Sequence, residues 1–214
     1  MSVISPTILA ETLDEYKAAV DRLQPFARHV HIDLSDGEFA PNFLIGESML
    51  YWPKEWEVDI HAMYARPTEH LAALIALKPS MILFHVEIQE DRAAIINQIK
   101  AAGIKAGIAL LRPTVPSTVA EIIKLADHVM VFSGDLGKYG GTASLMQLEK
   151  VRLIKAINPA VEIGWDGGIN IENAYTLAQG GVSVLNVGSG ISKAPDPAAA
   201  FVALTKEINK HGVI

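Results

Sequence analysis

Ionisable side chains interrupt runs of apolar residues at four places in the chain. The four segments are His31-Ile32-Asp33, Asp59-Ile60-His61, His85-Val86-Glu87 and Trp165-Asp166-Gly167-Gly168. Two imidazoles and two carboxylates among them, from His31, Asp33, His61 and Asp166, form a four-ligand set for one divalent metal ion. The mixture of nitrogen and oxygen suits Zn, Fe, Mn or Co. Any single member could be an isolated polar group, but burying all four without partners would be costly.

Spacing within these segments indicates how the side chains are presented. His31 and Asp33 are two residues apart, so they lie on the same face of a β-strand. His85 and Glu87 end another strand and could hydrogen-bond the ligands from outside the set, although a packing role is the alternative.

Glycine-rich segments form a second group. Gly167-Gly168 follows Asp166, Gly188-Ser189 comes near the end of the chain, and Gly140-Gly141 lies between them. Backbone N–H groups in such loops can bind phosphate, because glycine lets the ligand approach closely. Tight turns need glycine equally, and Gly140-Gly141 could instead be a flexible lid. Lys138 is a possible phosphate partner or an ordinary exposed lysine.

Short apolar runs alternate with amphipathic segments along the whole chain and predict eight strands separated by helices. The strands are expected at 3–5, 29–34, 58–62, 81–86, 106–110, 128–132, 161–165 and 183–187. Such alternation is typical of a parallel sheet. We expect residues 1–214 to form one α/β domain, a (β/α)₈ TIM barrel. A doubly wound open sheet is the alternative, but no Gly-x-Gly-x-x-Gly follows the first strand.

Helix boundaries can be read from a few residues. Ser117 and Asp196 are expected N-caps, with Pro197 in the first helical position. Gly103, Gly180 and Gly212 are expected where helices end. Leu13, Tyr16, Val20 and Leu23 fall on one helical face that should be buried.

Composition excludes several classes of protein. The chain has 214 residues, half of them hydrophobic and 20% charged, with a net charge of −6 and no Cys. These values argue against disorder, general nucleic-acid binding, disulfides and Cys-based metal sites. No basic N-terminal leader or long apolar stretch is present, so we expect a cytoplasmic protein that does not associate with membranes.

The combined motifs resemble the ribulose-phosphate 3-epimerase family over essentially the whole chain. The matching segments are Ser5-Pro6-Thr7-Ile8-Leu9, His31 to Gly37, Phe39-Ala40-Pro41-Asn42, Asp59 to Met63, His85-Val86-Glu87, Trp165 to Ile169 and Gly188-Ser189. They occur in the family's order. The resemblance implies a ribulose-phosphate-binding TIM barrel of carbohydrate metabolism, in the pentose phosphate pathway. It would epimerise a ketose phosphate at C3, with D-ribulose 5-phosphate and D-xylulose 5-phosphate as the expected pair.

The resemblance also assigns roles to residues. It implies that His31, Asp33, His61 and Asp166 bind the metal and that Asp33 and Asp166 are the catalytic acid/base pair. Substrate contacts would come from Thr7, Met63, Gly140, Gly141, Gly167, Gly168, Gly188 and Ser189. Thr7 stands where the family usually has Ser, and Met63 matches a methionine that caps the metal site. A homo-oligomer is also implied.

Three departures from the family pattern affect the rim of the site. Ser35 replaces a methionine, Arg112-Pro113-Thr114 replaces Pro-Gly-Thr, and Ser133 to Thr142 replaces a shorter phosphate loop. Asp135 in that loop adds a charge that phosphate would repel. The chemistry therefore transfers more safely than the identity of the ketose, which could be a hexulose 6-phosphate.

Two other functions remain possible. The hexulose-phosphate synthase and ketogulonate-phosphate decarboxylase group is similar in size and in its terminal glycine-rich loops. Its Asp-x-Lys-x-x-Asp motif is replaced here by Asp33, Ser35 and Glu38, without the lysine. A non-catalytic sugar-phosphate-binding barrel is the other alternative, motivated by the altered loop.

Overall fold

The strands form where the sequence has short runs of β-branched and other apolar residues, which suit parallel strands covered on their outer face. They are β1 (Val3–Ile8), β2 (His29–Ser35), β3 (Glu57–Met63), β4 (Met81–His85), β5 (Lys105–Leu110), β6 (His128–Phe132), β7 (Glu162–Asp166) and β8 (Val184–Val187). The computed structural model describes residues 2–138 and 140–210. All eight predicted strands are present, with ends that differ by up to three residues. The end of β7 bears on the site, because the strand includes Asp166 as its last residue, one residue beyond the expected end at 165.

Helices follow every strand except β2. They are α1 (Leu13–Leu23), α2 (Pro67–Ala76), α3 (Arg92–Ala101), α4 (Ala120–Leu125), α5 (Leu148–Ile157), α6 (Ala174–Gln179), α7 (Ser189–Ser192) and α8 (Pro197–Ile208). Between β2 and β3 the described chain forms only the short 3-10 helix η1 (Glu47–Met49), and η2 (Pro116–Val119) and η3 (Leu145–Gln147) precede α4 and α5.

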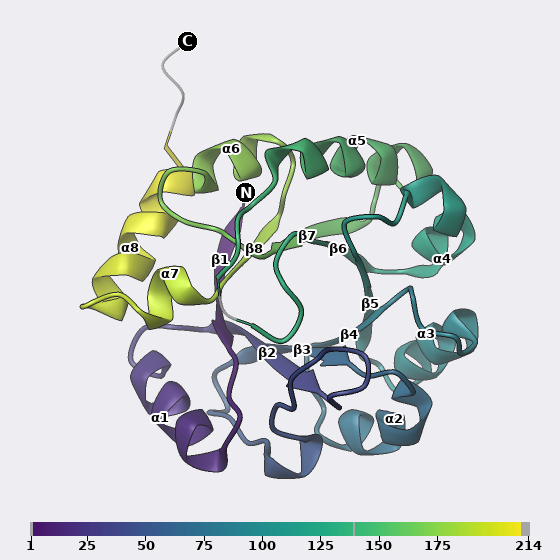
Figure 1. Ribbon diagram of the computed structural model, residues 1–214, viewed down its shortest axis with the longest axis horizontal. Helices are drawn as coiled ribbons and strands as arrows, with labels where there is room; N and C mark the ends of the chain where they lie inside the picture. Colours follow the sequence, from purple (N-terminus) through teal and green to yellow (C-terminus); the bar gives the residue numbers. More distant parts are fainter. Residues whose placement is uncertain (1, 139, 211–214) are drawn as a thin grey trace.

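Parallel pairing joins each strand to the next, and β1 pairs with β8, so the sheet closes into an eight-stranded barrel in a single domain. Figure 1 looks down the barrel and shows the helices as an outer ring. The predicted (β/α)₈ barrel is therefore confirmed, and the open doubly wound sheet is excluded.

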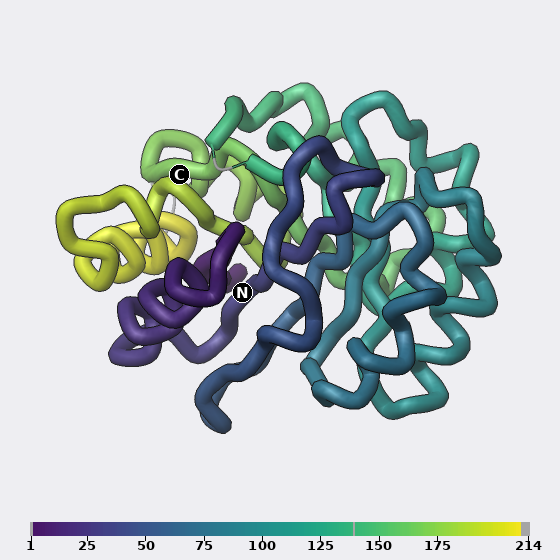
Figure 2. Tube along the Cα trace, turned by 60° about the horizontal axis from the view of Figure 1, so that its bottom comes forward, coloured from purple at the N-terminus to yellow at the C-terminus, as the bar shows by residue number. Residues whose placement is uncertain are grey.

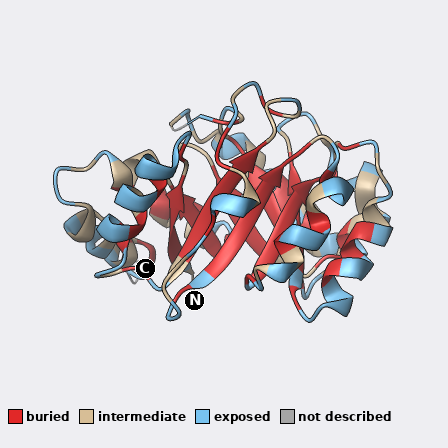
Figure 3. Cartoon of the chain, turned by 90° about the horizontal axis from the view of Figure 1, so that it is seen from below, coloured by how far each residue is buried: buried red, intermediate tan, exposed pale blue. Residues whose placement is uncertain are grey.

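Two apolar regions hold the barrel together. The larger one fills the space between strands and helices, where Tyr16, Val20 and Leu23 of α1 are buried. A smaller one fills the bore with Met81, Leu83, Ala109, Met130 and Phe132. Figure 3 shows this division, with buried strands inside and helices whose outer faces are exposed. Each helix therefore contributes one apolar face to the fold.

The first and last helices lie side by side and complete the outer ring. Figure 2 shows α1 in purple next to α8 in yellow. The rings of Phe26 and Phe201 are 5.3 Å apart between centroids. This contact links the two ends of the described chain, in addition to the pairing of β1 with β8.

Helix boundaries agree with the sequence at most positions. Asp196 caps α8 and accepts a hydrogen bond from Ala199 N at 3.0 Å. Gly103 lies beyond the end of α3 with φ of +77°, and Gly180 caps the end of α6. The prediction for Ser117 is wrong, because the 3-10 helix η2 places Val119 at the N-cap of α4. Gly212 lies outside the described residues.

Leu13 also departs from its prediction. It begins α1 but is 37% exposed, so the buried face of the helix starts at Tyr16. No described helix has the length and apolar character needed to span a lipid bilayer.

Candidate active site

Four ionisable side chains meet inside the mouth of the barrel. His31 and Asp33 come from β2, His61 from β3 and Asp166 from β7, and all four are buried. One ligand atom from each lies within 4.8 Å of the ligand atoms of the others. His61 Nδ1 is 2.9 Å from Asp33 Oδ1, and His31 Nε2 is 3.4 Å from the same oxygen and 3.9 Å from Asp166 Oδ2.

Strand register produces this convergence. Asp33 pairs with His61 across β2 and β3, and Asp166 is the last residue of β7. Since the carboxyl ends of all eight strands meet at one end of a TIM barrel, terminal polar residues of separate strands face a common space.

The residues fit a divalent cation. Both ring nitrogens of His31 are buried, and within the described part of the chain neither has a hydrogen-bond partner of good geometry. Two imidazoles and two carboxylates are also a donor set suited to Zn, Fe, Mn or Co. A cation among these atoms would compensate for the burial of two carboxylates and supply the partner that His31 lacks.

Burial and mutual contacts shift the pKa values of the cluster in opposite directions. Burial and the nearby Asp33 charge raise the pKa of Asp166 to about 7. Burial alone would also raise the pKa of Asp33, but contacts with His31 and His61 hold it well below its usual range. Burial lowers the pKa of His61 to about 4. In the absence of a cation, Asp33 is therefore ionised at neutral pH while Asp166 retains a proton for much of the time.

A pocket opens above the cluster. Its lining consists of Thr7, Asp33, Met63, Phe132, Gly134, Gly137, Lys138, Gly140, Asp166, Gly167, Gly168, Ile169, Asn186, Gly188 and Ser189. Seven of the eight residues expected to contact substrate are among them. The exception is Gly141, which packs beside the backbone of Gly134 and Asp135. Glycine-rich loops after β6, β7 and β8 thus border one space.

Gly167 has a structural reason for being glycine as well. Its φ is +101°, and a Cβ atom there would lie 2.0 Å from the backbone nitrogen of Gly134. A side chain would force apart the loops that follow β6 and β7. The turn requirement and the pocket-lining position therefore coincide at this residue.

Residues 133–138 and 140–144, which follow β6 and are called the β6 loop below, reach across the barrel mouth (Figure 1). Its base is closed by Ser133 Oγ, which accepts from Ser144 N at 2.9 Å, and Asn42 Nδ2 donates to Gly137 O at 3.1 Å. Lys138 lines the pocket, whereas the exposed Asp135 does not. The charge of Asp135, which was expected to repel a phosphate, therefore lies outside the lining of the pocket.

Ser35, His85 and Glu87 lie next to the cluster or its pocket. Ser35 is buried and its Oγ accepts from Gly37 N at 3.3 Å, so it supports a turn and leaves Met63 as an apolar wall. His85 contacts a member of the cluster, with its Nε2 2.9 Å from His61 Nε2. Glu87 contacts His85, 3.4 Å from its Nδ1, and not the four ligands.

Asn186 is a pocket residue that the sequence analysis missed. It lies on β8, is buried, and pairs in register with Asp166. Its Nδ2 is 3.2 Å from Met130 Sδ, and its Oδ1 has no hydrogen-bond partner among the described residues. An amide within the apolar run Val184-Leu185-Asn186-Val187 is the signal that could have identified it.

The synthase and decarboxylase alternative finds no support in the pocket. Glu38 stands at the last position of the aligned motif, but it is exposed and forms a bidentate ion pair with Arg66. No lysine occupies the motif position at Ser35.

Comparisons with known proteins agree with the site. The sequence model of the "Ribulose-phosphate 3 epimerase family" matches residues 3–192. The cytoplasmic isoform of ribulose-phosphate 3-epimerase from Oryza sativa is 30% identical, over 96% of this chain and 93% of that protein. The ribulose-phosphate 3-epimerase of Mycobacterium tuberculosis is 32% identical, over 96% of this chain and 92% of that protein.

Solved structures share the fold at lower identity. The 3-hexulose-6-phosphate synthase from Salmonella typhimurium aligns with a TM-score of 0.69 and 17% identity, over 96% of this chain and 98% of that one. Orotidine 5'-phosphate decarboxylase from Pyrococcus horikoshii aligns with a TM-score of 0.70 and 12% identity, over 98% of this chain and all of that one. These two similarities concern the barrel alone.

Proposed function

Since the chain belongs to the ribulose-phosphate 3-epimerase family, we propose that the pocket above Asp33 and Asp166 interconverts D-ribulose 5-phosphate and D-xylulose 5-phosphate. The protein is an enzyme of the isomerase class. The single observation that carries the proposal is the convergence of two buried carboxylates and two imidazoles, from β2, β3 and β7, at the floor of one pocket.

Inversion at C3 requires removing a proton from one face of the carbon and delivering one to the other. Asp33 and Asp166 come from strands on different sides of the barrel mouth, so their carboxyls can serve the two faces. The reverse reaction exchanges the two roles.

A divalent cation held by His31, Asp33, His61 and Asp166 would stabilise the negative charge that develops on the enediolate. Thr7 and Met63 would border the reacting end of the sugar. Backbone N–H groups around Gly168, Gly188 and Ser189 would bind the phosphate, since these residues line the pocket at the start of α7 and in the loop after β7.

The experiment follows exchange of the C3 proton of D-ribulose 5-phosphate by NMR in D₂O, with the metal-loaded protein. Asp33→Asn and Asp166→Asn should each reduce exchange at least about 100-fold, because general acid–base catalysis contributes that much or more. Both variants should keep the fold. Asp135→Asn, outside the pocket lining, is the control and should exchange normally. Undiminished exchange in either active-site variant would contradict the assigned roles.

Hexulose 6-phosphate and unphosphorylated ribulose belong in the same assay. Preferential turnover of the hexulose would support the alternative substrate. Binding without any proton exchange in the metal-loaded wild type would support the non-catalytic barrel.

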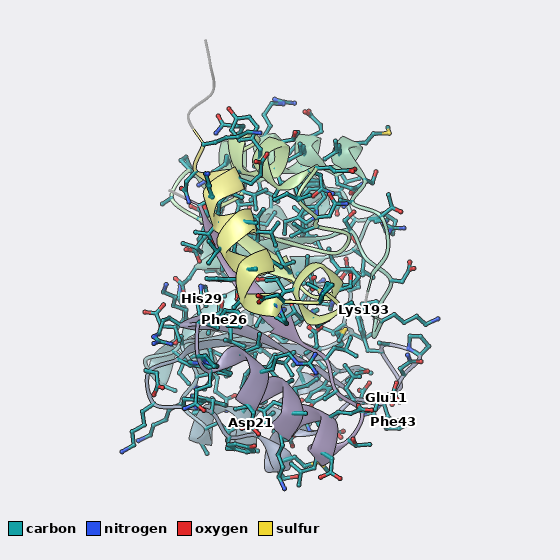
Figure 4. All side chains as sticks on the ribbon, turned by 90° about the vertical axis from the view of Figure 1, so that its left-hand side faces the viewer. Glu11, Asp21, Phe26, His29, Phe43 and Lys193 are labelled. Atoms are coloured by element: carbon teal, nitrogen blue, oxygen red, sulfur yellow. The ribbon has the colours of Figure 1, made fainter. Side chains whose placement is uncertain are left out.

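Location and assembly form a second part of the proposal. A cytoplasmic location is supported by the rice relative, whose name describes a cytoplasmic isoform. A homo-oligomer is supported by exposed apolar side chains such as Phe43 and Met146, which are 74% and 86% exposed. Figure 4 shows His29, the first residue of β2, toward the left and Phe43 toward the right. Phe43 therefore lies on the side of the carboxyl ends of the strands, where the site is. Light scattering coupled to size-exclusion chromatography would measure the oligomeric state.

A further inference from the structure

A chain of three side chains, two of them fully buried, leads away from the cluster of His31, Asp33, His61 and Asp166. His61 Nε2 is 2.9 Å from Nε2 of His85, the last residue of β4. His85 Nδ1 is in turn 3.4 Å from Glu87 Oε2, in the turn that follows β4. Both imidazoles are completely buried.

We propose that Glu87 is a positioning residue that acts through His85 to fix the tautomer of His61, leaving His61 Nδ1 with a lone pair for the cation. The proposal rests on the cation site proposed above. It concerns residues that do not themselves contact the cluster's centre.

The short contact between two neutral imidazoles restricts where the protons can be. Only one proton can lie between His61 Nε2 and His85 Nε2, because an N–H···N bond needs one donor and one acceptor. If His61 carries that proton, His61 Nδ1 is free to bind a cation and His85 holds its own proton on Nδ1, facing Glu87. If His85 carries it, His61 Nδ1 is protonated and His85 Nδ1 turns a lone pair toward Glu87.

Glu87 favours the first arrangement. A carboxylate oxygen opposite a protonated His85 Nδ1 is an attractive contact, whereas one opposite a lone pair is repulsive. His85 Nδ1 and Glu87 Oε2 are both buried, and neither has another hydrogen-bond partner in the described part of the chain. Each is therefore the available partner of the other.

The other oxygen of Glu87 is held by the loop after β5. Glu87 Oε1 accepts from Leu111 N at 2.9 Å and from the Thr114 hydroxyl. Burial alone would raise the pKa of Glu87, but contacts with His85, Thr114 and Leu111 hold it below its usual range. Lys150 Nζ donates to Leu111 O at 2.6 Å and fixes the same backbone. Glu87 is thus an ionised carboxylate with one orientation.

This arrangement destabilises the metal-free form of the cluster relative to the metal-bound form. With the proton on His61 Nε2, the lone pair of His61 Nδ1 faces Asp33 Oδ1 at 2.9 Å. Only a cation or another proton between them relieves that repulsion. With the opposite tautomer, His61 would donate to Asp33 and the cation would have to displace that proton. Glu87 therefore increases the affinity for the cation by disfavouring the tautomer in which His61 Nδ1 donates to Asp33.

Glu87→Gln tests the idea with little change of shape. If the amide NH₂ faces His85, His85 Nδ1 must accept, and the whole chain of protons reverses. If the NH₂ faces Leu111 N, two donors meet. That clash favours the first orientation, which reverses the bias, so the dissociation constant for Co²⁺, measured by titration calorimetry on the full-length metal-free protein, should rise about 10- to 100-fold, the range typical for partners of metal ligands. Glu90→Gln, at a half-buried carboxylate that accepts from Thr68 N at 3.0 Å and does not contact His85, is the matched control and should not change the constant.

A double-variant cycle separates positioning from general damage to the structure. In a His85→Gln background the link is cut, so adding Glu87→Gln should weaken Co²⁺ binding no further. Equal additional weakening in that background would overturn the proposal, as would an unchanged dissociation constant in Glu87→Gln alone.

Nitrogen-15 NMR reads the tautomers directly, in the wild type and in Glu87→Gln. In the metal-free state, the fraction of His61 protonated at Nε2 should be larger in the wild type than in Glu87→Gln, and equal fractions would overturn the proposal. Because these readouts are affinity and protonation, they remain informative if the C3 exchange assay fails. That assay alone decides the proposed function.

Discussion

At the level of single residues, Asp33 and Asp166 differ through their neighbours and not through their chemistry. Asp33 is 2.9 Å from His61 Nδ1 and 3.4 Å from His31 Nε2, whereas Asp166 has an imidazole nitrogen no closer than 3.9 Å. Desolvation dominates at Asp166, while contacts with the imidazoles outweigh it at Asp33. One type of side chain therefore supplies both a strong and a weak acid in one pocket.

Metal binding should release protons. Because the pKa of Asp166 is about 7 without a cation, and a metal ligand must be deprotonated, the cation has to displace a proton at lower pH. Contacts with Asp33 also outweigh burial and raise the pKa of His31, so the apparent association constant for Co²⁺ should rise by about tenfold per pH unit below pH 7 for each proton displaced. Calorimetry at pH 6, in buffers of different ionisation enthalpy, would count the protons. An association constant that is independent of pH between 5.5 and 7 would contradict this expectation.

The residue types of the cluster could be predicted from the sequence because they break apolar runs. The two-residue spacing of His31 and Asp33 even predicted their shared face. Asn186 also breaks an apolar run, and His85 and Glu87 were expected near the ligands, but neither the pairing of Asn186 with Asp166 nor the order of contacts from His61 through His85 to Glu87 could be predicted. Both depend on which strands are neighbours and on their register, and these are long-range properties that local pattern does not contain.

At the level of elements, strands and loops contribute differently to the site. The four cation-facing side chains all lie on strands, whose backbones are held on both sides by ladder hydrogen bonds. The β6 loop instead depends on a few tethers, at Ser133 and Gly137, and it brings Lys138 to the pocket. Lys138 has no ion-pair partner among the described residues, so its charge is available to an anion.

Lys138→Met should weaken the binding of a phosphorylated substrate without slowing the proton transfer. An exposed charge at the rim is worth about 1 kcal/mol, so KM should rise about fivefold with kcat nearly unchanged. Asp135→Asn, in the same loop but outside the pocket lining, is the control for altered loop charge. A fall in kcat without a change in KM would show that Lys138 acts on the chemical step. The rise in KM caused by Lys138→Met should disappear with an unphosphorylated ketose.

Strands and most helix ends followed from local sequence, but the course of the β6 loop did not. Its path depends on close approach between the Gly134 and Gly167 backbones and on a bond from Asn42, which is 95 residues away from Gly137. Reading Asp135 as a repulsive charge was reasonable from its position in the loop alone. Only the folded backbone determines that Lys138, three residues later, is the one that lines the pocket.

At the level of the whole molecule, the site joins distant parts of a closed sheet. β3 and β7 are four strands apart in either direction around the barrel, and each contributes a ligand to the cluster. Alternation of strands and helices predicted the closed barrel, but it could not predict the register of the closing pair, in which Val3 of β1 lies beside Val184 of β8. A cation bound by both β3 and β7 links opposite walls of the barrel.

A bound cation should therefore stabilise the entire fold. At a Co²⁺ concentration about 100 times the dissociation constant, the free energy of unfolding should rise by about 2.7 kcal/mol. For a chain of this size, that corresponds to an increase of roughly 5–10 °C in Tm. Differential scanning calorimetry with and without Co²⁺ would measure it. Asp166→Asn should lose most of this increase, and an equal increase in that variant would place the cation elsewhere.

The tethered β6 loop also has an evolutionary consequence. Since Asp33 and Asp166 are anchored in the barrel wall and Lys138 is carried by a surface segment with few attachments, mutations in that segment should alter the rim of the pocket without disturbing the two carboxylates. Exchange of residues 134–143 between homologous enzymes is therefore a practical way to engineer selectivity among ketose phosphates, with the rest of the scaffold held constant.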